Sequence, residues 1–376
     1  MKRICVEAGR IVLLSLYLCF TRLPSRRRIV CLSRESNHPT TDFKLIAQYV
    51  RSHHPDYQVV ILAKRLDNPI IYVFHMLRQL YYIATSEAVV LDTYAIIISL
   101  LSGHIRVPVI QMWHALGNMK RFGYTALGDT AGRSAQTARL MRMHQGYSSV
   151  LISSRSFMHD YAAGFGISES IIVEAPLPRT DLLLNRDYRA NRRSQILRRF
   201  PQLGRKKNIV YCPTFRQYEP SNRASALKTL VDSIDFSRYN LILKAHPLDG
   251  DLFDDNRVLQ HYPIGYDMLF IADYVISDYS TVIYEAGLMD IPVYLYAYDW
   301  PEYSSKRSLY IDLERDVPAM FTNDAHAIVH AIEQDDFDHE AYRKFVMRNV
   351  AVPSRESCTE RIVNHIFDLI ERSEQS

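Results

Sequence analysis

The sequence predicts an α/β protein with two domains, each built on a mainly parallel sheet. Short apolar runs alternate with helical patterns along most of the 376 residues, and strands separated by helices form right-handed crossover units with parallel strands. A chain of this length exceeds one usual hydrophobic core. A polar, basic stretch at residues 185–207 interrupts the alternation, and we interpret it as the helix and linker between the domains.

The first domain is expected to alternate strands and helices from residue 28 onward. Strands are expected at residues 28–32, 57–62, 88–92, 108–112, 148–152 and 171–174, and helices at 42–51, 70–84 and 156–164. In the second domain, strands are expected at 209–210, 241–243 and 274–276, and an amphipathic helix ends the chain at 358–372.

Residues 272–298 are the most informative stretch, because they indicate a strand, a polar turn, a short helix and another strand. The turn carries the capping side chains Ser277, Asp278, Ser280 and Thr281. It lies at the carboxyl end of a buried strand, where open α/β sheets bind ligands and where a helix start favours an anion. The alternative is an ordinary capped helix.

Three other expected strand ends carry side chains that a phosphate would bind. Arg216 follows the run at 209–210, the run at 241–243 leads into Lys244 and His246, and the run at 108–112 leads into His114. Guanidinium, ammonium and imidazole groups are ordinary phosphate partners. Each position alone is a weak signal, since a histidine after a strand is often structural.

Composition excludes several function classes. The chain is 48% hydrophobic with a net charge of +4, which fits a globular enzyme and is too small a charge to indicate nucleic-acid binding. The five cysteines form no CxxC pair, so we expect neither a zinc site nor a disulfide framework. Scattered cysteines of this kind are typical of a protein in a reducing compartment. Neither glycine-rich phosphate loop motif is present, so the helix-end turn would have to hold phosphates.

The amino terminus combines an apolar block at residues 11–20 with flanking basic residues. The block is short for a membrane span, and no good signal-peptide cleavage site follows it. One interpretation is an interfacial helix whose basic residues meet anionic lipid, and the other is a buried first helix. We favour membrane association.

Six segments occur together in the order of a known family. They are residues 113–123, 177–181, 211–216, 244–247, 277–281 and 296–310. In this set and order, over about residues 28–325, the chain resembles the CDP-glycerol glycerophosphotransferases of bacterial teichoic acid synthesis. The resemblance implies a GT-B-like α/β fold, in which two Rossmann-like domains with parallel sheets face a central cleft.

The resemblance also implies the division of the chain. An acceptor domain is expected at residues 28–205, a CDP-donor domain at 206–356, and a carboxyl-terminal helix that packs back on the first domain at 357–376. Before them, the apolar and basic residues described above predict a membrane-associating segment at residues 1–27. The implied reaction transfers glycerol phosphate from CDP-glycerol to a hydroxyl of an undecaprenyl-diphosphate-linked saccharide and releases CMP. The implied location is peripheral, on the cytoplasmic face of the membrane.

The resemblance assigns roles to particular residues. His114 matches the family's general base, and His246 matches a second histidine that donates to the phosphoryl oxygens. The expected substrate-binding residues are Lys120, Thr214, Arg216, Lys244, Asp278, Ser280, Thr281, Glu285 and Arg307. Within this set, Asp278 is expected to orient its turn or His246, and Lys120, with residues 37–42, to line the acceptor side. Glu285 lies one helical turn beyond Thr281, where nucleotide-binding folds of this kind receive ribose hydroxyls, and the alternative is a surface position on the helix. No metal or other cofactor is expected.

Departures from the family pattern leave some points open. Ala115, Leu116 and Gly117 replace the Gly-Thr-Pro of many members, as in the priming enzymes, and Ser308 and Ala319 replace family glycines. The polyol, glycerol or ribitol, and the number of units added therefore stay undecided. The alternatives are a ribitol phosphate transferase that uses CDP-ribitol, a nucleotide-sugar glycosyltransferase of the same fold, and a non-catalytic membrane scaffold.

Overall fold

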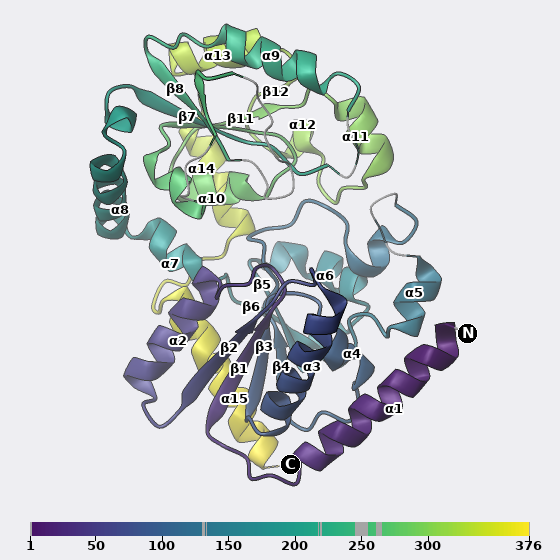
Figure 1. The fold of residues 1–376 in the computed structure, drawn as a ribbon. Helices are drawn as coiled ribbons and strands as arrows, with labels where there is room; N and C mark the ends of the chain where they lie inside the picture. The colour runs from purple at the N-terminus through teal and green to yellow at the C-terminus, as the bar shows by residue number, and fades with distance from the viewer. Residues whose placement is uncertain are drawn as a thin grey trace. The chain divides into compact units, whose positions relative to one another are not determined.

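A computed structural model describes residues 2–129, 132, 134–216, 218, 220–244, 255–260 and 265–375. The chain divides into two compact units (Figure 1). The first comprises Met1–Ala115, Arg121–Asp181 and Ala351–Ser376, and the second comprises Leu116–Lys120 and Leu182–Val350. The predicted class is confirmed, since each unit is an α/β layer structure on a parallel sheet of six strands.

The sheet of the first unit has the strand order β2-β1-β3-β4-β5-β6, and every described pairing is parallel. Its strands are β1 (Arg28–Ser33), β2 (Gln58–Ala63), β3 (Ala88–Leu91), β4 (Val109–Gln111), β5 (Ser149–Ile152) and β6 (Ile172–Glu174). All residues of β1 and β3 are buried, as expected for central parallel strands that helices cover on both faces.

Helices cover both faces of this sheet (Figure 1). On one side, α1 (Lys2–Phe20), α3 (Pro69–Ala84) and α4 (Ile96–Leu100) pack over Val30, Leu32 and Leu91. On the other side, α2 (Thr41–His53) packs against α15 (Cys358–Glu374). The remaining helices are α5 (Ala135–Leu140), α6 (Met158–Phe165), α7 (Arg179–Leu184), η1 (Gly123–Ala126), η2 (Arg155–Phe157) and η3 (Glu169–Ile171).

The sheet of the second unit has the order β12-β11-β10-β7-β8-β9 and is parallel in its described pairings. Its strands are β7 (Lys207–Cys212), β8 (Tyr239–Leu243), β9 (Val258–Leu259), β10 (Tyr274–Ser277), β11 (Val293–Tyr296) and β12 (Phe321–Thr322). Its helices are α8 (Arg186–Arg199), α9 (Arg223–Ser233), α10 (Val282–Leu288), α11 (Trp300–Lys306), α12 (Leu313–Asp316), α13 (Ala325–Gln334), α14 (His339–Asn349), η4 (Pro201–Gly204) and η5 (Gly265–Ile271).

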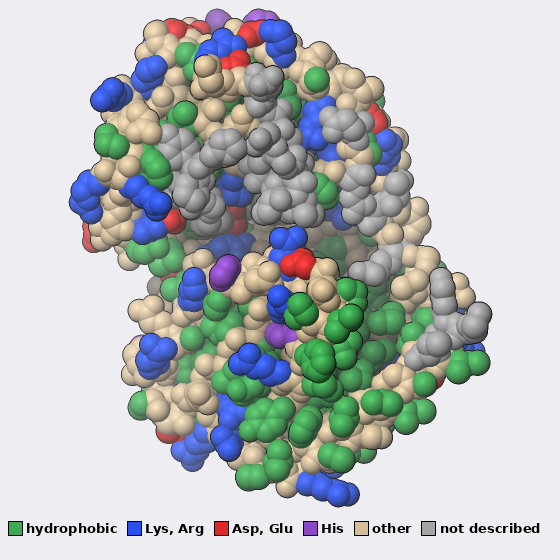
Figure 2. All heavy atoms as spheres, in the orientation of Figure 1, with side chains coloured by type: hydrophobic (Ala, Val, Ile, Leu, Met, Phe, Trp, Pro, Cys, Tyr) green, Lys and Arg blue, Asp and Glu red, His purple; other side chains and the backbone are tan. Residues whose placement is uncertain are grey.

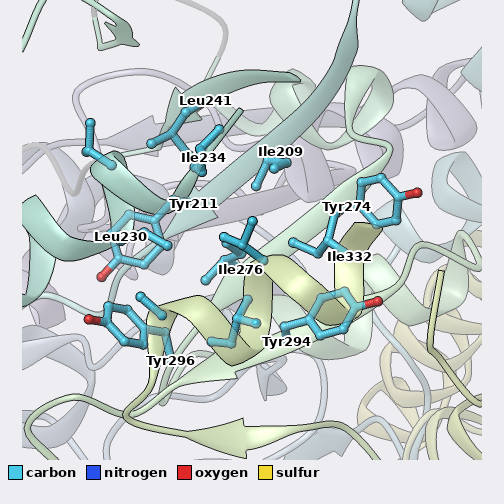
Figure 3. Packing of buried hydrophobic residues seen from close by; sticks show 14 of the residues in the cluster. Ile209, Tyr211, Leu230, Ile234, Leu241, Tyr274, Ile276, Tyr294, Tyr296 and Ile332 are labelled. Atoms are coloured by element: carbon cyan, nitrogen blue, oxygen red, sulfur yellow. The ribbon is translucent and has the colours of Figure 1, made fainter. Parts of the chain in front are cut away.

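The core of the second unit lies between this sheet and the helices α9 and α13 (Figure 3). Ile209, Tyr211 and Ile276 extend from the sheet, and Leu230 and Ile332 come from the two helices. The alternation of inward side chains along β7 follows from the two-residue period of a strand.

The basic helix α8 belongs to the second unit, so the contact division falls at residue 182 and not at the expected 206. The reason is a set of contacts with η5 and the segment after it. Arg192 forms an ion pair with Asp267, and Arg193 forms one with Asp273 at 3.1 Å. Tyr188 also packs edge-to-face on Phe270.

The carboxyl-terminal helix returns to the first unit through a capped start. Asp181 accepts hydrogen bonds from the backbone N–H groups of Cys358 and Thr359, at 2.8 and 2.9 Å. Ser357 and Glu360 complete a capping box at the same end. Asp181, the last residue of the motif segment 177–181, therefore anchors the first turn of α15 to the first unit.

The amino-terminal segment forms one helix that is partly in the core. Tyr17 of α1 is 1% exposed within the apolar cluster of the first unit. Other apolar side chains of α1 are exposed, among them Ile4, Ile11 and Val12. Within the described residues, no helix combines the length and apolar character needed to cross a bilayer. One face of this helix is therefore part of the core, and membrane association of the exposed face stays a prediction.

Candidate active site

His114 lies just beyond the carboxyl end of β4, on a strained backbone. Trp113 has a φ of 57°, a left-handed conformation that is uncommon for a bulky residue and is found at functional sites. The N–H of Trp113 donates to Gln111 Oε1 at 2.9 Å, and its ring stacks on Phe122 and meets Phe165 edge-on. These contacts fix the backbone that carries His114.

The imidazole of His114 is held through one nitrogen. Its Nδ1 lies 3.2 Å from the carbonyl oxygen of Asp92 and 3.9 Å from a Glu35 carboxylate oxygen. Because a carbonyl only accepts, this contact requires the proton on Nδ1 and leaves the lone pair on Nε2. The side chain is 39% exposed. A neutral His114 is therefore arranged to accept a proton at Nε2.

Arg179 holds the backbone of His114 through a hydrogen bond, a role that the sequence analysis did not assign. Its Nη2 donates to the His114 carbonyl oxygen at 2.8 Å. Its backbone N–H and Nη1 both donate to the carboxylate of Asp42, which is 5% exposed. The resemblance had included Arg179 in the segment 177–181, and Asp42 at the end of the loop 37–42. Neither sequence segment alone indicates that Arg179 and Asp42 form an ion pair.

Asp92, whose carbonyl oxygen faces His114, also has a buried carboxyl group. Asp92 follows β3 and is 3% exposed. Burial raises its pKa to about 8, and the nearby charges of Glu35 and Asp42 add to the shift. Asp92 is therefore protonated at neutral pH and brings no charge to the site.

In the second unit, Arg216 occupies a buried network between two strand ends. Its Nη1 donates to Asp278 Oδ2 at 2.9 Å and its Nη2 donates to Asp299 Oδ1 at 2.7 Å. Its side chain is 2% exposed, and it lies over the rings of Tyr279, Tyr298 and Tyr303. Burial alone would lower the pKa of Arg216, but Asp278 and Asp299 raise it above its ordinary value. Its donors are directed at protein groups, whereas the sequence analysis expected a diphosphate there.

Asp278 joins the two turns that follow β7 and β10. Its carboxylate accepts from the backbone N–H of Thr214 at 2.9 Å and from that of Tyr279. Ser277 Oγ also donates to the carbonyl of Cys212 at 2.9 Å. These bonds hold the backbone of the turn that carries Ser280 and Thr281.

The hydroxyl turn precedes α10, which has seven residues. Ser280 and Thr281 are partly buried, and Ser280 Oγ accepts from the Val282 N–H at 3.4 Å. Glu285, expected at the ribose, is 7% exposed on α10. Lys244 lies at the end of β8, and its backbone N–H donates to Tyr211 at 2.8 Å. His246 lies outside the described residues.

Lys120 belongs to the second unit and not to the acceptor side where it was expected. Its strand-like segment pairs with Leu309, and its Nζ lies 3.5 Å from Thr214 Oγ1. Burial lowers the pKa of Lys120 to about 8, Asp278 opposes that shift, and Arg307 and Arg216 reinforce it. Lys120 therefore lies beside Thr214, and the charge of Arg307 is close enough to act on Lys120.

Gly117 allows this segment to pack closely against Tyr284 of α10 within the second unit. Its φ is +66°, and an added Cβ would lie 2.3 Å from the Tyr284 ring. The Tyr284 hydroxyl also donates to the carbonyl of Asn118 at 3.1 Å. A residue with a side chain would be strained at position 117 and would clash with the ring.

No set of three His, Cys, Asp or Glu side chains among the described residues could hold a metal ion. Lys120, Lys244 and Arg307 are the cationic residues of the second unit that the sequence analysis expected at a phosphate besides Arg216. The structure thus gathers Lys120, Thr214, Arg216, Asp278 and Arg307 in that unit.

The comparisons with known proteins agree with one another. A model of the CDP-glycerol:poly(glycerophosphate) glycerophosphotransferase family matches residues 15–368. The teichoic acid ribitol-phosphate primase of Bacillus spizizenii is 28% identical over 331 residues, 84% of this chain and 84% of the relative. The teichoic acid glycerol-phosphate primase of Bacillus subtilis is 25% identical over 338 residues, 86% of this chain and 83% of the relative.

Solved structures show the same fold. The wall teichoic acid polymerase TagF superposes with a TM-score of 0.78 at 17% identity, and the match covers 100% of this chain and 99% of the TagF chain. A second TagF structure, soaked with CDPG, matches with a TM-score of 0.76. The GT-B-like fold that the resemblance implied is confirmed.

Proposed function

Because the chain belongs to the CDP-glycerol:poly(glycerophosphate) glycerophosphotransferase family, we propose that it transfers glycerol phosphate from CDP-glycerol to a hydroxyl of a lipid-linked teichoic acid precursor. CMP is the second product. The observation that supports this most directly is the arrangement of His114, whose Nδ1 faces a carbonyl and whose Nε2 keeps its lone pair. That arrangement suits a general base.

The chemistry proceeds by in-line displacement at the β-phosphorus of the donor. The acceptor oxygen forms a bond to that phosphorus as Nε2 of His114 takes the hydroxyl proton. The bond from the phosphorus to the bridging oxygen breaks, and that oxygen leaves with CMP. Negative charge moves toward the CMP phosphate, so cations near the donor stabilise the transition state.

The second unit supplies the donor groups in this proposal. Lys120, Lys244 and Arg307 provide positive charge, and Thr214, Ser280 and Thr281 provide hydroxyl donors. Thr214, Lys244, Ser280 and Thr281 follow the strands β7, β8 and β10, and Lys120 lies beside Thr214. Arg216 and Asp278 act through the backbone they hold in place. His246 keeps its proposed role as a donor to the phosphoryl oxygens.

Ribitol phosphate is the second candidate for the transferred group. The relative named a ribitol-phosphate primase is 28% identical, and the relative named a glycerol-phosphate primase is 25% identical. Purified protein should be given CDP-glycerol or CDP-ribitol with a lipid-linked acceptor, and CMP release measured for each. Release of a nucleoside diphosphate from a nucleotide sugar would instead support a glycosyltransferase of this fold, and no turnover of any donor would support a scaffold.

We also propose that the first unit attaches to the cytoplasmic face of the membrane through an apolar surface on α1 and α3. Ile11 and Val12 of α1 are 60% and 58% exposed, and Ile70 and Phe74 of α3 are 72% and 69% exposed. Figure 2 shows hydrophobic side chains gathered over this part of the first unit. Exposed apolar surface of this extent with flanking basic residues fits an interfacial attachment.

Substitution tests this attachment better than deletion, since Tyr17 of α1 is part of the core. Ile11→Asp combined with Phe74→Asp should release most of the protein from sedimenting vesicles and leave thermal unfolding nearly unchanged. A matched pair of surface changes, Met347→Asp with Leu184→Asp in the second unit, should leave sedimentation unchanged. Equal sedimentation of all three proteins would contradict the attachment.

A further inference from the structure

Helix α3 carries a polar cluster directly after its exposed apolar start. Ile71, His75 and Arg78 are spaced by four and three residues, so they lie on one side of the helix. The Nε2 of His75 is buried and has no hydrogen-bond partner in the part of the chain that the structure describes. Burial lowers the pKa of His75, and the positive charges of Arg78 and Lys64 lower it further.

Arg34, which follows β1, reaches the same cluster. Its guanidinium carbon lies 5.7 Å from the centre of the Tyr72 ring, and the His75 ring centre lies 5.7 Å from the Tyr72 ring centre. Nη1 of Arg34 donates to the Tyr94 carbonyl at 3.0 Å, but its Nε is buried without a partner among the described residues. Two buried nitrogens without partners beside one ring are unusual, because each costs free energy.

The cluster has positive charge that no carboxylate of the described chain neutralises. Within those residues, none of Arg34, Lys64 and Arg78 forms an ion pair, and the nearby Asp67 pairs with Arg65 at 3.5 Å. Arg34 and Lys64 follow β1 and β2, so they lie at the same carboxyl edge of the first sheet as His114. An anion there would lie at the same edge of the sheet as the proposed base, two to three strands away.

The apolar side chains next to the cluster indicate what kind of anion this is. Ile70, Ile71 and Phe74 are 72%, 51% and 69% exposed. Figure 2 shows Lys, Arg and His side chains beside the hydrophobic surface of this unit. A ligand that satisfies both parts has a phosphate end and a long apolar chain.

We propose that Arg34, Lys64, His75 and Arg78 bind the diphosphate of an isoprenoid lipid whose chain lies along Ile70, Ile71 and Phe74. The inference rests on the proposed function, and it specifies how the lipid-linked acceptor is held. Three cations and an imidazole match a diphosphate better than the single negative charge of a phospholipid diester. The bound diphosphate sets how far the acceptor hydroxyl extends toward His114.

Vesicle binding without any donor tests the site. Neutral phosphatidylcholine vesicles are prepared with and without undecaprenyl diphosphate, and binding of the full chain is compared with that of Lys64→Gln/Arg78→Gln. The double variant should lose at least about tenfold of the diphosphate-dependent affinity, since hydrogen bonds to charged groups each contribute more than neutral ones. Lys44→Gln/Arg51→Gln, on exposed positions of α2, changes the same net charge and should bind like the parent.

Two further arms separate the sources of phosphate. An equal loss on phosphatidylglycerol vesicles would mean bulk attraction to an anionic surface and would overturn the proposal. Equally tight binding of inorganic pyrophosphate alone would mean a free-anion site and would overturn the part played by the lipid chain. Unchanged binding of the double variant to diphosphate vesicles would overturn the site itself. Arg78→Gln alone, at an exposed position, repeats the test if the double variant does not fold.

The outcome is independent of turnover. If binding depends on Lys64 and Arg78 but no donor yields CMP, the lipid site stands and the proposed function fails. If CMP is released from lipid-linked acceptors but binding is insensitive to both residues, the function stands and this site fails.

Discussion

The carboxyl edges of the two sheets hold their ionisable motif residues in opposite ways. In the first unit, His114 is 39% exposed, and Arg179 holds its backbone from behind. In the second unit, the Arg216 side chain is 2% exposed and donates its hydrogen bonds to Asp278 and Asp299. The comparison teaches that one motif residue can be open to solvent, as His114 is, while another is buried and bonded to protein groups, as Arg216 is. In the proposed function the first reacts and the second stabilises the fold.

Arg216→Ala should have the largest effect, and it should be an effect on stability. Removing the cation leaves two buried carboxylates without their partner, which costs about 3–5 kcal/mol. Denaturant unfolding of the purified variant measures the loss. If stability is kept and only CDP-glycerol binding falls, Arg216 faces the ligand and the contrast between the two edges is wrong.

His114→Ala should lower turnover without unfolding the protein. Loss of a general base reduces the rate by roughly 10²-fold or more, while CDP-glycerol should still bind. His104→Ala, at an exposed position in the same unit, is the matched control and should keep full activity. Lost donor affinity in the His114 variant would show that its role is misassigned.

Lys120 should give donor binding a pH dependence. Its pKa of about 8 means that the cation is lost as pH rises through that value. Affinity for CDP-glycerol should therefore fall by up to about tenfold between pH 7 and pH 9, as one ionisation predicts. Lys120→Arg should flatten this profile, because an arginine keeps its charge. A parent profile without this fall would exclude Lys120 from the donor site.

Asp92→Asn should have the smallest effect and the opposite sign, a gain in stability. The folded protein keeps Asp92 protonated up to about pH 8, while the unfolded chain ionises it above about pH 4. The parent thus loses stability as pH rises between those values, and the variant does not. Thermal unfolding at pH 5 and pH 9 should show a gain at both values that is clearly larger at pH 9, where the unfolded chain is fully ionised. A gain of equal size at both values would point to packing instead.

The sequence predicted the layers and the strand ends well, because both depend on local patterns. Alternating apolar runs located the strands that end near His114, Arg216 and Lys244. Which side chains meet depended on distant pairing. Arg179 and Asp42 are 137 residues apart, and Arg216 and Asp299 are 83 apart. Nothing local indicated that Lys120 would join the second unit, since its partner Leu309 lies far along the chain.

The capped start of α15 has a consequence for how this chain matures on the ribosome. Residues 351–376 complete the first unit but are translated after the whole of the second. Amino-terminal domains usually fold first during synthesis. In this chain the second unit is fully translated by residue 350, before the first unit receives its last segment. Until α15 arrives, the α2 side lacks contacts such as the stacking of His54 on Phe367. A fragment ending at residue 181 should aggregate, and a circular permutant that begins at residue 351 should fold in translation order.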